Sequence, residues 1–130
     1  MIVADSSFIA EGILADRSLI RSELMLSPSL AVYEVAGAVW KHQALLGRIR
    51  EGDKFLAVLS DLLATRRLLT VEPDRELIMD AHRIAVRHGA HPNDAVFVAV
   101  ALKSGLELRT FDAAQRKVFE DARSGRGEGA

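Results

Sequence analysis

Four acidic residues occupy positions from which their side chains could together bind a metal ion and cleave a phosphodiester. Asp5 follows the apolar run MIVA, Asp94 opens an apolar helical segment, and Asp112 ends the stretch ELRTFD. Glu34 is the only charged residue in positions 30–40. Carboxylates that converge repel each other, and Mg²⁺ or Mn²⁺ is the counter-charge that suits oxygen ligands. One or two such ions would activate water, orient the phosphodiester and neutralise the leaving oxygen.

Three hydroxyl side chains lie close to these acids in the sequence. Ser6, Ser7 and Thr110 are placed to donate hydrogen bonds to the carboxylates or to contact a substrate phosphate. Helix capping and strand-end hydrogen bonding would account for the same hydroxyls without any function. The hydroxyls therefore support a site only if the acids form one.

Each acid also has a structural explanation. Asp5 and Asp112 stand where helix N-caps belong, and Asp94 falls in a first helical turn, where negative charge suits the helix dipole. Glu34 is harder to explain in this way, because apolar residues surround it on every helical face. A buried carboxylate without a partner is strongly disfavoured, so Glu34 indicates a binding site unless its side chain faces solvent.

Short apolar runs alternate with helical patterns along the chain. The strands are expected at 1–4, 24–26, 68–71 and 106–110. The helices are expected at 7–15, 27–46, 52–65, 74–87, 93–103 and 113–122. Ser27 and Pro28 read as the cap and start of the second helix, and Gly47, Gly89 and Gly105 stand where C-terminal glycines belong.

Strands separated by helices call for a parallel sheet with helices on both faces. We therefore expect an α/β protein, a three-layer α/β/α sandwich with four to five short parallel strands. Sites in such sheets form at the carboxyl ends of the strands, and the four acids fall at or shortly after those ends. Residues 1–123 are expected to form this domain, with 124–130 (SGRGEGA) as a disordered tail.

The composition fits a globular protein but does not by itself suggest a nuclease. The chain has 130 residues, of which 49% are hydrophobic and 27% charged, and it has no cysteine, which excludes disulfides and thiolate metal sites. The start has no basic leader, and the longest apolar run, 95–102, is too short to span a bilayer, so we expect a cytoplasmic location. With a net charge of -1, RNA would have to be held by a local basic patch or by metal ions. Candidates for phosphate contacts are Arg48, Arg50, Lys54, Arg66 and Arg67.

Three segments together resemble the PIN-domain family. MIVADSSFIA resembles its opening, an apolar strand that runs into Asp and then Ser. SPSLAVYEVAGAVWK resembles the second segment, in which a lone Glu sits in an apolar helix. NDAVFVAVALKSGLELRTFD resembles the third, where Asp-Ala opens an apolar helix and a later strand ends in Thr-x-Asp. The segments have the family's order and spacing and cover residues 1–119.

The resemblance implies roles for particular residues and for the whole chain. The family's catalytic, metal-binding positions fall on Asp5, Glu34, Asp94 and Asp112, and its supporting polar positions on Ser6 and Thr110. The length and layout are similar to the toxins of bacterial and archaeal VapBC toxin–antitoxin pairs. That similarity implies an RNA endonuclease dependent on Mg²⁺ or Mn²⁺, a homodimer, and inhibition by a small antitoxin protein. PIN domains also serve in RNA processing and decay, so the toxin role stays open.

Two other functions fit some of these features. A phosphatase resembling the haloacid dehalogenases also has Asp after its first strand, but usually a second acid two residues later, where this chain has Ser7. Such a phosphatase also has a lysine motif ahead of its final acids, which is not evident here. A non-catalytic binding module would use the acids only as helix caps and an apolar helix to bind its partner. The helix has more apolar residues than one core-facing stripe needs, at Val32, Val35, Val39 and Trp40. These residues would form such a partner surface, a dimer or antitoxin surface, or part of the core.

Overall fold

A four-stranded parallel sheet forms the centre of the protein. The structure is a computed structural model that describes residues 1–125. Strands β1 (Ile2–Ala4), β2 (Met25–Pro28), β3 (Leu68–Val71) and β4 (Leu108–Arg109) lie in the order β3-β2-β1-β4. β1 pairs with both β2 and β4, so that Val3 lies opposite Leu26 and Leu108. Every residue of β1 is buried, as expected for a parallel strand covered on both faces.

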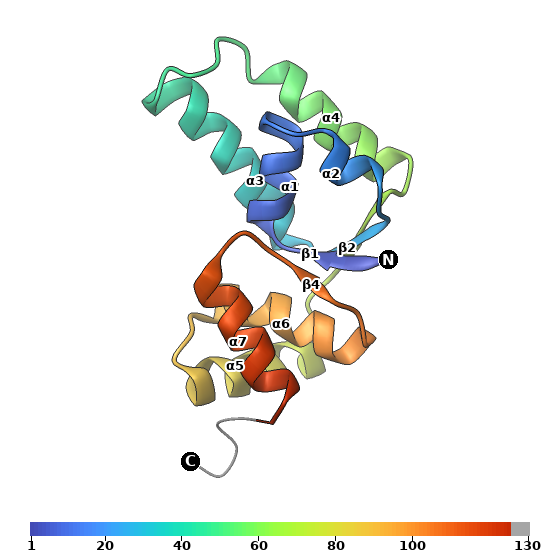
Figure 1. Ribbon diagram of the computed structural model, residues 1–130, viewed down its shortest axis with the longest axis vertical. Coiled ribbons are helices and arrows are strands. Elements are labelled where there is room, and N and C mark those ends of the chain that lie inside the picture. Colours follow the sequence, from blue (N-terminus) through green and yellow to red (C-terminus); the bar gives the residue numbers. More distant parts are fainter. Residues whose placement is uncertain (126–130) are drawn as a thin grey trace.

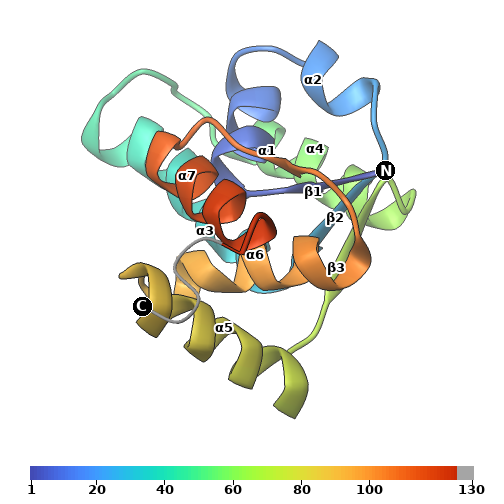
Figure 2. The same ribbon diagram turned by 60° about the horizontal axis from the view of Figure 1, so that its bottom comes forward.

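Helices cover both faces of this sheet (Figure 1). One layer contains α1 (Ser6–Leu14), α2 (Ser18–Arg21), α3 (Leu30–Trp40) and α4 (Asp53–Ala64). The other contains α5 (Arg75–His88), α6 (Pro92–Ser104) and α7 (Ala113–Arg123). Figure 2 shows α6 between the sheet and α5, and α6 contacts β1, β2 and β4. The predicted three-layer α/β/α sandwich is confirmed.

Helix α6 is the central helix of the second layer, and its sequence explains why. Its side chains at Ala95 and 97–101 are buried, and small residues among them allow the helix to approach the sheet closely. His91 caps the helix, because its Nδ1 accepts a hydrogen bond from the backbone N–H of Asn93 at 3.0 Å. Gly105 ends it with a left-handed φ of 70°, the conformation that favours glycine. These local signals fix where the acid at the start of α6 lies.

The start of α3 differs from the prediction. Ser27 and Pro28 belong to β2, and α3 begins at Leu30 without a side-chain cap at Ser29. The Ser27 hydroxyl instead donates to the carbonyl of Ala4 in the neighbouring strand. Pro28 is the last residue of β2 and lies beyond Met25 and Leu26, the residues that pair with β1. The prediction that Ser27 and Pro28 cap and start the helix was wrong, because both residues serve the sheet.

Two helical segments were not predicted as such. The expected helix through residue 46 is α3 followed by a single π-helical turn, η1 (Lys41–Leu45). The short helix α2 follows Asp16, whose Oδ1 accepts hydrogen bonds from the backbone N–H and the hydroxyl of Ser18. An aspartate whose carboxylate accepts a hydrogen bond from the backbone two residues later is typical of a turn. The Asp-x-Ser spacing at residues 16–18 could have indicated this turn.

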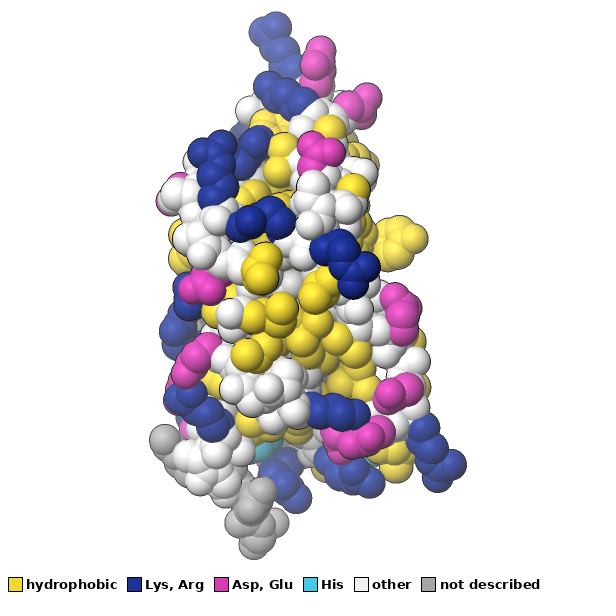
Figure 3. All heavy atoms as spheres, turned by 90° about the vertical axis from the view of Figure 1, so that its right-hand side faces the viewer, with side chains coloured by type: hydrophobic (Ala, Val, Ile, Leu, Met, Phe, Trp, Pro, Cys, Tyr) yellow, Lys and Arg dark blue, Asp and Glu magenta, His cyan; other side chains and the backbone are white. Residues whose placement is uncertain are grey.

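The chain end and the surface complete the description. Of the predicted tail, Ser124 ends α7 by donating from its hydroxyl to the carbonyl of Glu120, and residues 126–130 lie outside the described residues. No helix within residues 1–125 is long and apolar enough to cross a membrane. Figure 3 shows a face with hydrophobic side chains across its middle and charges of both signs above and below. That face carries no extended basic surface.

Candidate active site

The carboxyl edge of the sheet brings together segments that lie far apart in the sequence. Asp5 follows the central strand β1, and Asp112 comes three residues after the end of β4 beside it. Glu34 lies in the second turn of α3, which follows β2 on the other side, and Asp94 lies in the first turn of α6. Three observations connect these acids. Glu34 accepts a hydrogen bond from Ser6, next to Asp5. The charges of Asp94 and Asp5 act on Glu34, and Asp94 and Asp112 line one pocket.

Asp5 is buried and held by three hydrogen bonds. Its Oδ1 accepts from the Ser7 hydroxyl at 2.7 Å and from the Phe8 backbone N–H at 3.0 Å. Its Oδ2 accepts from the Thr110 hydroxyl at 2.5 Å. The bond from Phe8 is an N-cap of α1, so the predicted capping role is confirmed. Capping uses only one of the three bonds, and the other two fix the orientation of the carboxylate.

The two hydroxyls that hold Asp5 also hold the loop between β4 and α7. The Ser7 Oγ accepts from the backbone N–H of Phe111 at 3.0 Å, and the Thr110 Oγ1 accepts from that of Asp112 at 2.9 Å. Each hydroxyl therefore accepts from a loop amide and donates to one oxygen of Asp5. This arrangement joins the position of Asp112 to that of Asp5 through two parallel paths.

Glu34 is exposed to solvent as a residue, which contradicts the expectation that its apolar surroundings bury it. Val35 and Val39 are buried on the face of α3 that packs against the core. Glu34 lies outside this face. The carboxylate accepts a hydrogen bond from the Ser6 hydroxyl at 2.7 Å. Partial burial of the carboxyl raises its pKa, and the charges of Asp94 and Asp5 raise it further, while the Ser6 bond lowers it.

Asp94 and Asp112 line one pocket. The pocket has a volume of about 360 Å³ and also includes His91, Gln115 and Lys117. Asp112 is an exposed N-cap of α7, and its Oδ1 accepts from the backbone N–H groups of Ala114 at 2.9 Å and Gln115 at 3.2 Å. Asp94 is exposed, and within residues 1–125 no hydrogen bond or ion pair is formed by its carboxylate. It therefore faces the pocket available to a ligand.

The donor set suits a hard divalent cation that keeps much of its water. Four carboxylates and the hydroxyls of Ser6, Ser7 and Thr110 lie at this edge, and oxygen atoms of this kind are the ligands that Mg²⁺ and Mn²⁺ prefer. Among the residues that the structure describes, no three His, Cys, Asp or Glu side chains form a ready-made metal site. Mg²⁺ commonly binds through one or two carboxylates, several waters and substrate phosphates. The role of the four acids as ligands stays a prediction.

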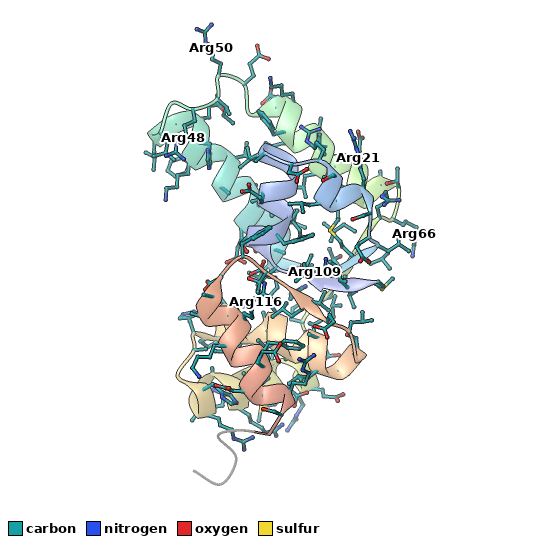
Figure 4. All side chains as sticks on the ribbon, viewed as in Figure 1. Arg21, Arg48, Arg50, Arg66, Arg109 and Arg116 are labelled. Carbon is teal, nitrogen blue, oxygen red and sulfur yellow. The ribbon has the colours of Figure 1, made fainter. Side chains whose placement is uncertain are left out.

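Two arginines next to the acids were not recognised in the sequence. Arg109 precedes Thr110, and its carbonyl accepts from the backbone N–H of Asp5 at 3.1 Å. Arg116 lies one turn into α7, and its Nη2 donates to the carbonyl of Thr110 at 2.7 Å. Both lie near the middle of the molecule in Figure 4, at the β4–α7 segment. The only available signal was their spacing around the Thr-x-Asp segment.

The basic residues named from the sequence lie elsewhere. Arg48 and Arg50 project from the far end of the α3–α4 hairpin, and Arg66 lies beside the edge of the sheet away from α7 (Figure 4). Arg67 is engaged, because its Nη2 donates to the carbonyl of Arg21 at 2.6 Å. Arg116 also donates to a carbonyl, that of Thr110, and Arg109 pairs with Glu23, but both arginines belong to the segment that carries Asp112.

Comparison with known proteins agrees with this geometry. The PIN domain family model matches residues 2–120. The chain is 37% identical over 98 residues to Ribonuclease VapC3 of Pyrobaculum aerophilum, a match that covers 75% of this chain and 73% of that relative. Residues 2–120, which the family model matches, contain all four strands and all four acids. The chain therefore belongs to the PIN-domain family.

Proposed function

We propose that this PIN-domain protein is an RNA endonuclease that needs Mg²⁺ or Mn²⁺ and acts in the cytoplasm as the toxin of a toxin–antitoxin pair. The name of its relative, Ribonuclease VapC3, supports RNA as the substrate and the toxin class. The observation that carries the proposal is the 2.7 Å hydrogen bond from Ser6 to Glu34. It holds a carboxylate of α3 beside the end of β1, where partial burial raises the pKa of Glu34 and the charges of Asp94 and Asp5 raise it further. Helix capping does not explain this contact, because Glu34 lies inside α3.

The residues that would hold the metal are Asp5, Glu34, Asp94 and Asp112. A bound divalent cation supplies an activated water and neutralises charge on the phosphodiester. Ser7 and Thr110 keep Asp5 in one orientation, and Ser6 does the same for Glu34. The N-termini of α6 and α7 border the pocket that Asp94 and Asp112 line, and the positive ends of the two helix dipoles favour an anionic phosphate there.

Partners are proposed on the same basis. The relative's VapC name supports a small antitoxin protein as inhibitor, and we infer a homodimer as well. Along α3 and η1 the large hydrophobic side chains of Tyr33, Trp40 and Leu45 are exposed. Exposed large hydrophobic side chains along one helical segment suit a protein interface, whereas Val35 and Val39 are buried in the core.

The proposed function is tested by cleavage of mixed single-stranded RNA. The purified protein, free of partners, is incubated with Mg²⁺ or Mn²⁺ and with EDTA, beside Asp5→Asn and Asp94→Asn. We expect cleavage only with metal, and a loss of more than about 100-fold in both variants, since even outer-shell changes at metal sites cost about 10–100-fold. Cleavage that persists in EDTA or in the variants would contradict the mechanism. Release of phosphate from a small phosphomonoester without RNA cleavage would contradict the ribonuclease.

A further inference from the structure

An exposed aromatic ring stands between two residues of the candidate active site. Phe111 lies between Thr110, which holds Asp5, and Asp112. Its side chain is 58% exposed. A single exposed hydrophobic residue needs no explanation by itself. Its position is notable, because its neighbours on both sides, Thr110 and Asp112, belong to the candidate active site.

The ring is held in a defined orientation. It stacks on Phe8 with a centroid separation of 5.8 Å and an interplanar angle of 14°. Phe8 is only 2% exposed, so the stack is anchored on the core of α1. The Phe111 backbone is also fixed, because its N–H donates to the Ser7 hydroxyl at 3.0 Å. One ring face is thus packed on the protein, and the exposure of the side chain leaves the other side open to a flat ligand.

An arginine lies on each side of this segment. Arg109, two residues before Phe111, places its guanidinium 5.8 Å from the centre of the Phe8 ring, where the carboxylate of Glu23 also lies 3.7 Å from it. Arg116 follows Phe111 by five residues and contacts the carbonyl of Thr110. Figure 4 shows both arginines at this segment, far from those of the hairpin tip. An aromatic ring beside guanidinium groups is the combination that binds single-stranded nucleic acid, with bases on the ring and phosphates on the cations.

We propose that Phe111 is a base-stacking platform, on whose open side lies an unpaired base of single-stranded RNA next to the cleaved bond. This inference rests on the proposed ribonuclease function and names how that site takes its substrate. Stacking accepts any base, since every base has a π-face, so the platform selects unpaired nucleotides without selecting a sequence. A base in a duplex is already stacked on both sides and cannot use it. Phe111 is a positioning residue, whose stack sets where the neighbouring phosphate lies relative to the acids.

The test compares Phe111→Ala, Phe111→Leu and Phe111→Tyr on a short single-stranded RNA whose cleavage position has been mapped. Matched oligomers each lack the base at one nucleotide near that position. We expect Phe111→Ala to raise KM about tenfold or more. Phe111→Leu keeps an apolar contact with Phe8 but has no π-face. We therefore expect it to raise KM as much as Phe111→Ala does. Phe111→Tyr should stay within about twofold of the wild type.

The base-lacking oligomers decide whether the ring acts through a base. At one position, loss of the base should raise KM for the wild type as much as Phe111→Ala does, and the two changes together should add nothing. Equal losses for Phe111→Ala on intact and base-lacking RNA, at every position, would overturn the proposal. So would full activity of Phe111→Leu. Thermal unfolding of each variant shows whether a loss comes from misfolding, and the tyrosine variant remains informative if the alanine variant does not fold.

A binding measurement separates this inference from the proposed function. Fluorescence anisotropy of a labelled single-stranded RNA is recorded with Asp94→Asn, alone and combined with Phe111→Ala. Binding that falls about tenfold with Phe111→Ala supports the platform, even if the wild type cleaves no RNA and the proposed function fails. Cleavage without any dependence of binding on Phe111 leaves the function intact and overturns the platform. Absence of both cleavage and binding overturns both.

Discussion

At the scale of single residues, Asp5 combines a structural and a chemical position. Its Oδ1 caps α1, and its Oδ2 is held by Thr110 from the other end of the chain. Asp112 likewise caps α7 while it lines the pocket with Asp94. The two interpretations that the sequence left open are therefore not exclusive. The sequence predicted that the Ser7 and Thr110 hydroxyls bond a carboxylate, but it could not predict that each holds a different oxygen of Asp5.

Thr110→Val tests the hydrogen bonds that orient Asp5. Valine keeps the shape of threonine but removes the bonds to the Asp5 carboxylate and to the Asp112 amide. We expect the free energy of unfolding to fall by about 1–3 kcal/mol, because buried polar groups lose their partner. RNA cleavage should fall by about 10–100-fold. Urea unfolding and initial cleavage rates measure the two effects.

Thr65→Val is the matched control for this substitution. The Thr65 hydroxyl donates to the carbonyl of Asp61 at 2.7 Å, in an exposed position away from the acids. Its loss should change the free energy of unfolding by less than about 0.5 kcal/mol and leave cleavage unchanged. Equal behaviour of the two variants would show that Thr110 has no special role at the site.

Glu34→Gln tests the electrostatics of the acid cluster through the pH dependence of stability. The pKa of Glu34 is raised in the folded protein by partial burial and by Asp94 and Asp5. The folded state therefore holds this proton to higher pH than the unfolded chain does, and ionisation of Glu34 costs stability. The cost is absent below the usual glutamate pKa and complete above the raised pKa. In metal-free buffer, Glu34→Gln should lose less stability than the wild type as pH rises through this window.

Urea unfolding at several pH values measures this difference. Glu51→Gln, at an exposed glutamate of the loop before α4, is the control and should follow the wild type. The same pH profile for Glu34→Gln and the wild type would contradict the proposed interaction between the three acids.

At the scale of elements, residues that end a helix were predicted correctly where their role depends only on neighbouring residues in the sequence. Gly89 and Gly105 end α5 and α6 in the left-handed conformation, as their positions after helical patterns predicted. Ser27 and Pro28 misled because their use is set by the neighbouring strand. Patterns along one segment report burial and caps, whereas a contact between strands depends on the order of the sheet, which no segment encodes by itself.

Two helical glycines give a prediction about how the first helical layer packs. A Cβ added to Gly12 in α1 would lie 2.3 Å from the Cγ2 of the buried Ile20, whereas a Cβ at Gly37 in α3 meets no atom within 4 Å. Gly12→Ala should therefore destabilise the fold by about 1–3 kcal/mol through overpacking. Gly37→Ala should stabilise it by up to about 1 kcal/mol, because alanine is the better helix former. Thermal unfolding compares the pair, and a stabilising Gly12→Ala would show that α1 and α2 do not pack closely.

At the scale of the whole molecule, the sheet order explains how a chain with a net charge of -1 can present a site for RNA. β1 lies between β2 and β4, so the acid after β1 meets those carried by the segments that follow its two neighbours. The alternation of strands and helices predicted the three layers but not this order. It also gave no means to distinguish Arg109 and Arg116, at the site, from Arg48 and Arg50, at the hairpin tip.

The proposed metal-dependent cleavage of RNA requires the acids at this edge in a role beyond helix capping. The most direct measurement is the cleavage rate against Mn²⁺ concentration for the wild type, Asp94→Asn and Asp74→Asn. Asp74 caps α5 by accepting from the Leu77 N–H at 2.8 Å, and asparagine caps about as well as aspartate. We expect Asp74→Asn to follow the wild type, while Asp94→Asn loses more than about 100-fold at every Mn²⁺ concentration. An Asp94→Asn curve that overlies the wild-type curve would contradict this requirement.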